Sequence, residues 1–508
     1  MTEPVGEMSA RAGGTGGYNR EEEGVNVSHV LSDDLDAVVG GMSFADGDSR
    51  HDLQLGDSSE NGKAGKKKGA GFEEAEDGEG IVEGGADSNA VEESVKRTVK
   101  SILNVLIPYG GMLSTGFNLA STSIGAGILG LPAAFNNAGT IMATIYIVLI
   151  TAETVYSMRL LAQVADKTGL RSFEEMGKYL LHPHADVVVA ITRALHTYGG
   201  SVAYVVTIGD LLKPILSSIS GTPEFLLEAT GRKLLQTAFW LVFMFPLIFA
   251  RSFNSLRFVS ATGILFIVFF SLVVIVHCGM YGLKAEPRAK TTLFNTGNEA
   301  TNVVGVFVFS YMCQIAALEL YWEMRKRNTR DFTLCAAVSM TVCGVLYFLT
   351  GLFGYLDFGT QVKGSVLLHY NPIEEPQVFV SYIGIFIKIC ASFGLLNNAC
   401  RCALFPVFGW DPKTAPYWKH AAAAVIIALV AFVLGIFVPN INVVFSLTGS
   451  LAGGLVGFIL PALYMMYSGN WTLRSVGIVN YVSTYLVLIA GVVALVFGTA
   501  GTIWSLAG

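Results

Sequence analysis

Apolar stretches long enough to cross a membrane recur along most of this chain, separated by short polar connections that contain Gly or Pro. A transmembrane α-helix needs about 20 apolar residues to cross a hydrocarbon core roughly 30 Å thick. Eleven stretches approach or exceed this length, at 113–135, 139–162, 187–212, 234–250, 256–281, 301–323, 332–356, 377–400, 420–438, 441–467 and 477–505. The pattern predicts an all-α polytopic membrane protein with about 11 transmembrane helices.

Composition agrees with this prediction. The 508 residues are 52% hydrophobic and 14% charged, with a mean hydropathy of +0.53, a balance unlike that of a water-soluble globule. Residues 1–100 differ, since they hold 22 of the 39 acidic residues and 10 of the 33 basic ones. Such an acidic, Gly-rich segment buries too little apolar surface to offset its chain entropy. We therefore expect a disordered acidic tail at 1–100 and a transmembrane domain at 101–508.

The basic residues of the connections predict the orientation. With the tail in the cytoplasm, the inner connections carry thirteen Lys and Arg residues and the outer ones carry seven. Cytoplasmic loops of membrane proteins are enriched in these residues. We therefore expect a cytoplasmic N-terminus, and an odd number of spans then places the C-terminus on the opposite side.

The first span contains four residues that disfavour a continuous helix. Gly125, Gly127, Gly130 and Pro132 lie within eight positions; each glycine costs about 1 kcal/mol in a helix interior, and proline removes a backbone hydrogen bond. We expect the helix to unwind at 125–127. Free amides at such a break bind a carboxylate and free carbonyls bind an ammonium group, so a zwitterionic amino acid fits. The alternative is a kink that only eases helix packing.

The same glycines match the dinucleotide fingerprint G-x-G-x-x-G, but that motif requires a preceding strand and a soluble helix after it. Here it lies inside a membrane span and Pro132 follows at once. We expect no cofactor. The seven cysteines lie in or beside apolar runs without zinc spacing, so we expect no metal site either. The spans also contain no paired catalytic motif and no channel filter motif, so neither an enzyme nor an ion channel is predicted.

Ionisable residues inside the spans mark further candidate sites, because a charge in a bilayer is costly. They are Glu153, Arg193, His196, Asp210, Glu319, Glu323 and Lys388. Those near span ends are expected to reach water, and a hydrogen-bonded packing role for His196 is preferred to a proton site. Glu153, Glu319 and Lys388 lie nearer mid-span. They either serve a substrate or ion path or form structural pairs, and the two roles can coexist.

Two segments resemble the amino acid/auxin permease family. Residues 123–135, Ser-Ile-Gly-Ala-Gly-Ile-Leu-Gly-Leu-Pro-Ala-Ala-Phe, are similar to its first-span signature, and residues 309–324 are similar to its sixth-span segment. Gln314 stands where the common form has His and Glu319 where it has Pro, departures that resemble the kinetoplastid amino acid transporters. The similarity covers roughly 110–505.

The resemblance implies a five-plus-five inverted repeat with spans 1 and 6 broken, one extra span, and substrate held between spans 1 and 6. Span 6 carries only Gly305 as a helix breaker, so its break is expected from the family alone. The expected substrate-binding residues are Ser123, Gly125, Ala126, Gly127, Ser310, Tyr311, Gln314 and Glu319. The expected coupling residues are Lys388, Ser392 and Glu153.

These expectations predict transport of L-amino acids by alternating access. An ammonium at Lys388, one turn from Ser392, would repel a sodium ion there, which predicts sodium-independent uptake, either proton-coupled or facilitative. A carboxylate at Glu319 favours cationic substrates such as arginine or lysine. The alternatives are a neutral amino acid transporter, a transporter of another organic solute, and an amino-acid-sensing receptor without net transport.

The expected partners are therefore an amino acid substrate, the lipid bilayer and a candidate cytoplasmic partner of the acidic tail, with no nucleic acid. We expect a multi-pass protein of the plasma membrane. An acidic organelle membrane is the alternative.

Overall fold

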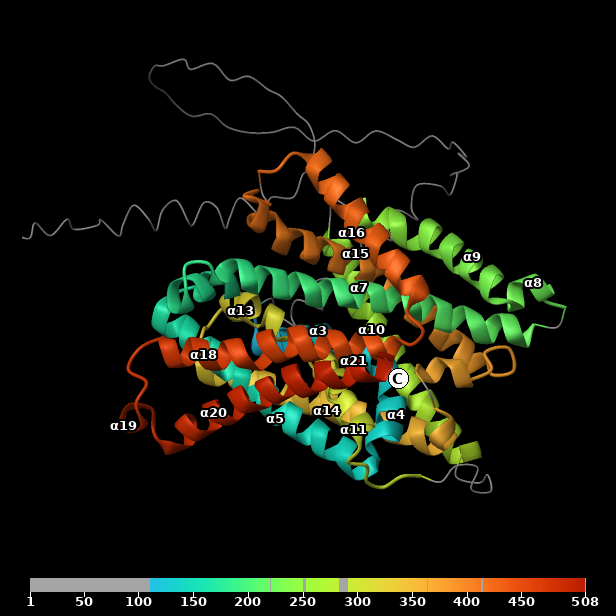
Figure 1. The fold of residues 1–508 in the computed structure, drawn as a ribbon, viewed down its shortest axis with the longest axis horizontal. Coiled ribbons are helices and arrows are strands. Elements are labelled where there is room, and N and C mark those ends of the chain that lie inside the picture. Colours follow the sequence, from blue (N-terminus) through green and yellow to red (C-terminus); the bar gives the residue numbers. More distant parts are fainter. Residues whose placement is uncertain are drawn as a thin grey trace, which may run out of the picture. The chain divides into compact units, whose positions relative to one another are not determined.

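The computed structural model describes residues 110–507 apart from 220, 250–252, 283–290, 363 and 413, and only the backbone at 253–262 and 507. The predicted acidic tail lies outside the described residues. Every regular element in the described part of the chain is helical (Figure 1). The all-α class predicted from the hydropathy pattern is confirmed.

Ten helical segments are long and apolar enough to cross a membrane, and a bent pair, α3 (Met112–Ser123) and α4 (Gly127–Ala138), makes an eleventh span in the described residues. The first half continues with α5 (Thr140–Thr168), α7 (Ala185–Ser218), α9 (Ala229–Phe239) extended by η2 (Trp240–Met244) and η3 (Phe245–Phe249), and α10 (Phe253–His277) extended by η4 (Cys278–Gly282).

The second half contains α11 (Asn298–Asn302), α12 (Val304–Ser310) and α13 (Gln314–Glu323) in one span, then α14 (Thr329–Phe358), α15 (Pro376–Leu404) and α16 (Tyr417–Phe437). The tenth span joins α17 (Ile441–Thr448), the π-helix η8 (Gly449–Ile459) and α18 (Leu460–Tyr467). The last comprises α20 (Ile478–Val493), η9 (Ala494–Gly498) and α21 (Thr499–Ala507). The predicted count of about 11 spans is confirmed.

The first span breaks where its glycines predicted. Helix α3 ends at Ser123, Ile124 adopts an extended conformation (ψ 94°), and α4 begins at Gly127. The two helices meet at an angle of 60°. Pro132 lies inside α4 rather than at the break.

The sixth span breaks without any glycine or proline at the break. Residues 311–313 separate α12 from α13. Gly305, the only helix breaker in the sequence of this span, instead serves helix packing: a Cβ built there would lie 2.1 Å from the Ser446 carbonyl oxygen, and one built on Gly449 would lie 2.0 Å from the Gly305 carbonyl oxygen. These glycines let α12 approach α17 and η8 backbone to backbone.

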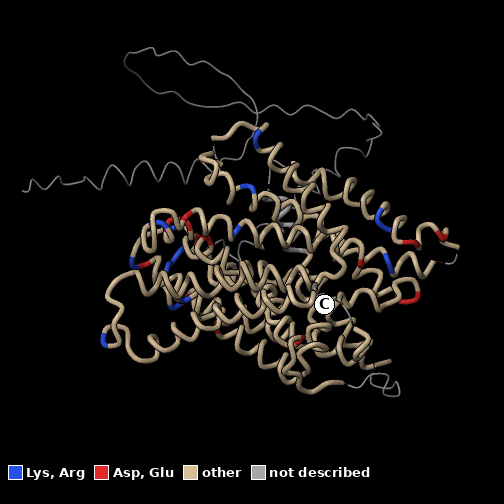
Figure 2. The backbone as a smooth tube through the Cα atoms, viewed as in Figure 1, with Lys and Arg blue, Asp and Glu red and all other residues tan. Residues whose placement is uncertain are grey.

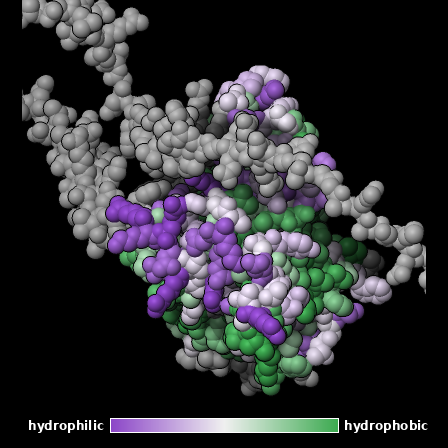
Figure 3. Space-filling model, turned by 90° about the vertical axis from the view of Figure 1, so that its left-hand side faces the viewer, coloured by the Kyte–Doolittle hydropathy of each residue, from purple (hydrophilic) through white to green (hydrophobic). Residues whose placement is uncertain are grey.

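Other helices hold the two broken spans in place. Helix α14 packs against α3, α4 and α5, while α7 packs against α15, α16 and α17. Lys, Arg, Asp and Glu concentrate toward the ends of the long helices (Figure 2). Viewed from the end at which α13 and α18 finish, hydrophilic residues gather beside largely hydrophobic flanks (Figure 3). Apolar flanks with polar ends are the surface that a bilayer requires of a spanning bundle.

Candidate functional site

A cavity of about 90 Å³ lies at the two helix breaks, which is large enough for more than one water molecule. Its walls come from both broken spans, from α7 and from α15. The lining residues are Thr122, Ser123, Gly125, Ala126, Gly127, His196, Gly200, Ala203, Tyr204, Phe309, Ser310, Met312, Ile315 and Leu396. Five of the predicted substrate-binding residues, Ser123, Gly125, Ala126, Gly127 and Ser310, are therefore brought together.

Hydrogen bonds join the two breaks. The Ser123 hydroxyl donates to the Ser310 carbonyl oxygen at 3.0 Å. The buried Tyr347 hydroxyl of α14 lies 2.8 Å from both the Ser123 and the Ser310 carbonyl oxygens, and its single proton serves one or the other. Sequence reasoning missed Tyr347, although a tyrosine in an apolar span usually has a hydrogen-bond partner.

The two glycines of the first break face different surroundings. A Cβ on Gly125 would meet only the Tyr204 hydroxyl at 3.6 Å and the Ser123 carbonyl oxygen at 4.0 Å, which are ordinary contacts. A Cβ on Gly127 would lie 2.5 Å from the Ser310 hydroxyl oxygen. Gly125 therefore leaves space in the cavity, whereas Gly127 permits the close approach of α4 to α12.

Helix α7 supplies the wall that sequence reasoning did not assign. His196, Gly200, Ala203 and Tyr204 recur at helical spacing and all line the cavity, as expected for one face of a helix. His196 is 6% exposed, and its Nδ1 has no hydrogen-bond partner among the described residues. Its ring lies 5.3 Å from that of Phe309. The four-residue spacing was visible in the sequence, but the direction in which this face of α7 points was not.

Tyr311 and Gln314 belong to the second break but do not line the cavity. The Tyr311 hydroxyl lies 2.8 Å from the Thr151 hydroxyl of α5. Gln314 is 1% exposed, and a Cβ built on Gly457 of η8 would lie 3.5 Å from its amide nitrogen. Their predicted roles in substrate binding have no support from this cavity and stay predictions.

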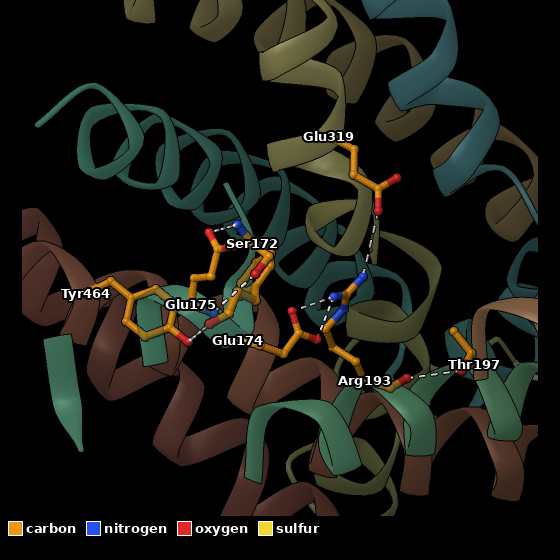
Figure 4. A network of polar contacts seen from close by, with 8 residues as sticks. Ser172, Glu174, Glu175, Arg193, Thr197, Glu319 and Tyr464 are labelled. Atoms are coloured by element: carbon orange, nitrogen blue, oxygen red, sulfur yellow. Dashed lines mark hydrogen bonds and ion pairs between the residues drawn. The ribbon is translucent and has the colours of Figure 1, made fainter. Parts of the chain in front are cut away.

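Glu319 lies in a separate polar network (Figure 4). The Arg193 guanidinium of α7 donates to both oxygens of Glu174, at 2.7 and 2.9 Å, and Glu174 lies in the short helix α6 (Phe173–Met176). The Glu319 carboxylate is 4.0 Å from Arg193 Nη2, and its side chain is 65% exposed. Glu319 does not line the cavity, so its predicted role in substrate binding has no support from the cavity and stays a prediction.

None of the three predicted coupling residues lines the cavity. Lys388 is 2% exposed on α15 and packs against α10, where a Cβ on Gly263 would lie 2.5 Å from its own Cβ. Ser392, one turn along α15, lies within hydrogen-bonding reach of the Tyr204 hydroxyl. Glu153 is half-buried on α5 and does not line the cavity.

The lining of the cavity contains no Asp, Glu, Lys or Arg. Its polar groups are hydroxyls, one imidazole, and backbone at the helix ends, where the last turn of α3 exposes carbonyls and the first turn of α4 exposes amides. Such ends bind an ammonium group and a carboxylate respectively. The described residues contain no group of His, Cys, Asp and Glu that could hold a metal ion.

The chain is similar to several known transporters. Residues 109–504 match the family described as transmembrane amino acid transporter protein. The chain is 26% identical to sodium-coupled neutral amino acid transporter 7 of Xenopus laevis, over 70% of this chain and 81% of the relative. It is also 26% identical to vacuolar amino acid transporter 5 of Schizosaccharomyces pombe, over 72% and 86%.

Among solved structures, the fold is similar to that of MhsT in complex with L-phenylalanine. The TM-score is 0.50 and the sequence identity 14%, and the match covers 75% of this chain and 98% of that one. This likeness concerns the fold alone.

Proposed function

The chain belongs to the transmembrane amino acid transporter family, which is the amino acid/auxin permease family that its first-span motif resembled, and we propose that it carries L-amino acids across its membrane by alternating access. The proposed binding site is the cavity at the two helix breaks. The observation that carries this proposal is that five predicted binding residues from spans 1 and 6 line one cavity. Helices broken at the membrane midplane are the usual binding sites of such transporters.

Neutral amino acids fit the cavity better than cationic amino acids do. The preference for arginine or lysine depended on Glu319, which lies outside the cavity and is 65% exposed. A cationic side chain entering a lining without carboxylates would lose its hydration without a partner. The backbone groups at the breaks suffice for the zwitterionic part of the substrate, and the rest of the lining is uncharged.

Sodium-independent uptake, either proton-coupled or facilitative, remains part of the proposal. Its support is the buried Lys388 ammonium one turn from Ser392, which itself adjoins Tyr204 of the cavity wall. A positive charge at this depth opposes a bound cation nearby. One relative is named as sodium-coupled and another as vacuolar, so both the ion and the compartment require direct measurement.

We propose a cytoplasmic N-terminus and residence in the plasma membrane, with an acidic organelle membrane as the alternative. The excess of basic residues in the inner connections supports the orientation. The name of the fission yeast relative favours the organelle alternative.

Uptake of radiolabelled amino acids into proteoliposomes tests the transport proposal. Accumulation above that in protein-free liposomes, blocked by excess unlabelled substrate, is the expected result. A protein that binds an amino acid without accumulating it would instead be a sensor, and one that neither binds nor accumulates any amino acid would contradict the proposed substrate class.

A further inference from the structure

His196 combines burial, position and an unmet hydrogen bond. It lies on the α7 face that lines the cavity, and it is 6% exposed. Among the described side chains of the cavity lining, its Nδ1 is the one buried polar atom without a partner. A buried polar atom left unpaired costs about 1–3 kcal/mol. A packing histidine would be expected to bond a neighbour, whereas Nδ1 bonds none of the described residues and the His196 side chain belongs to the cavity lining.

Two kinds of group line the cavity, backbone at the helix breaks and side chains of α7. Backbone groups at the ends of α3 and α4 suit the carboxylate and ammonium groups that every amino acid has. The α7 wall carries His196 and Gly200, and a Cβ on Gly200 would lie 2.7 Å from Leu396 Cδ1. Gly200 therefore lets Leu396 of α15 pack closely against α7, and uncharged side chains form the cavity wall beside His196.

We propose that His196 determines specificity by hydrogen-bonding the side chain of a neutral, polar amino acid, a substrate class that rests on the proposed transport function. An apolar side chain of the same size would offer the His196 imidazole no hydrogen-bond partner. A cationic side chain would find no carboxylate in the lining. Sites built to hydrogen-bond a substrate group discriminate strongly against analogues that lack it.

Competition between near-isosteric amino acids tests the inference. Uptake in proteoliposomes is measured with asparagine against leucine and with glutamine against methionine as competitors. The wild-type protein should prefer each amide by about tenfold or more, the effect expected for one buried hydrogen bond left unmade. In His196→Leu the preference should disappear, and His196→Asn should restore part of it.

Ser201→Ala is the matched control. Ser201 is a fully buried polar residue of the same helix, bonds the Thr197 carbonyl oxygen of its own helix at 3.1 Å, and does not line the cavity. The Ser201→Ala variant should prefer amides as strongly as the wild type does.

The outcomes separate the two proposals. Wild-type protein that accumulates no amino acid would overturn the transport function. Wild-type protein that accumulates amino acids but prefers leucine, methionine or arginine would overturn the role of His196 alone, as would a preference for amides that persists in His196→Leu. If His196→Leu does not fold, two measurements still decide. The wild-type protein must prefer the amides, and His196→Asn must keep part of that preference.

Discussion

Gly125 leaves space in the cavity where any other residue would place a side chain. The Cβ of a substituted residue would make only ordinary contacts, the nearest at 3.6 Å from the Tyr204 hydroxyl. We therefore expect Gly125→Val to fill the site without disturbing the fold and to lower the apparent affinity for substrate at least about tenfold, as filling a site by a few methyl groups typically does. Uptake kinetics and the melting temperature in detergent measure the two effects.

Gly127→Val is the comparison, because Gly127 belongs to the same break but packs closely against α12. The side chain would overlap Ser310, whose hydroxyl oxygen lies 2.5 Å from the position of the new Cβ. We expect this variant to lose stability as well as uptake. Equal loss of stability in both variants would contradict the distinction between a site glycine and a packing glycine.

Glu319 provides a third test at the scale of a single residue. Its carboxylate is exposed and lies 4.0 Å from Arg193, while Glu174 takes the short contacts to the same guanidinium at 2.7 Å. Exposed pairs of this kind contribute little, so Glu319→Gln should change the KM for substrate less than about twofold. Selective loss of arginine and lysine uptake in this variant would restore the cationic prediction made from the sequence.

At the scale of elements, contact between α12 and the tenth span depends on two glycines. A Cβ on Gly305 would lie 2.1 Å from a backbone carbonyl oxygen of α17, so the helices would have to separate. Gly305→Ala should lower the free energy of unfolding by about 1–3 kcal/mol, the usual cost of overpacking. Melting in detergent measures the effect, and Gly279→Ala, where nothing lies within 4 Å, is the control. Equal melting temperatures for the two variants would contradict this packing role.

At the scale of the whole molecule, the coupling ion depends on how α15 sits between α7 and α10. We expect uptake in proteoliposomes to proceed without sodium, and to be stimulated by acidity on the side from which substrate enters or driven by the substrate gradient and membrane potential. Lys388→Ala should lose transport. Uptake by the wild type that requires sodium would contradict the assignment, whatever the variant does.

With eleven spans in the described residues, antibody access to the two ends of the chain should report the orientation. An epitope tag after Gly508 should bind antibody in intact cells if the protein is in the plasma membrane, and a tag before Met1 should bind only after permeabilisation. Antibody access to the same tags on sealed, isolated organelles tests whether the protein lies in an organelle membrane instead. Both tags on one side would contradict the count of eleven spans.

The sequence by itself determined the class of the protein, the number of spans and the first helix break. These follow from local quantities: the length of an apolar run must match the bilayer, and clustered glycines weaken a helix wherever it lies. The first-span motif added the family. No partner from another part of the chain is needed for any of these conclusions.

Only the tertiary structure decided which residues face the cavity. The sequence does not distinguish Gly125, Gly127 and Gly305, yet in the structure only Gly125 leaves room for a Cβ. Gly127 lines the same cavity but packs against Ser310, and Gly305 packs against Ser446. His196 lines the cavity whereas Glu319 lies beside Arg193 outside it, because packing against other helices sets how each helix is rotated. The break at 311–313 has no helix breaker of its own, so it depends on long-range contacts such as the bond from Tyr347 to Ser310.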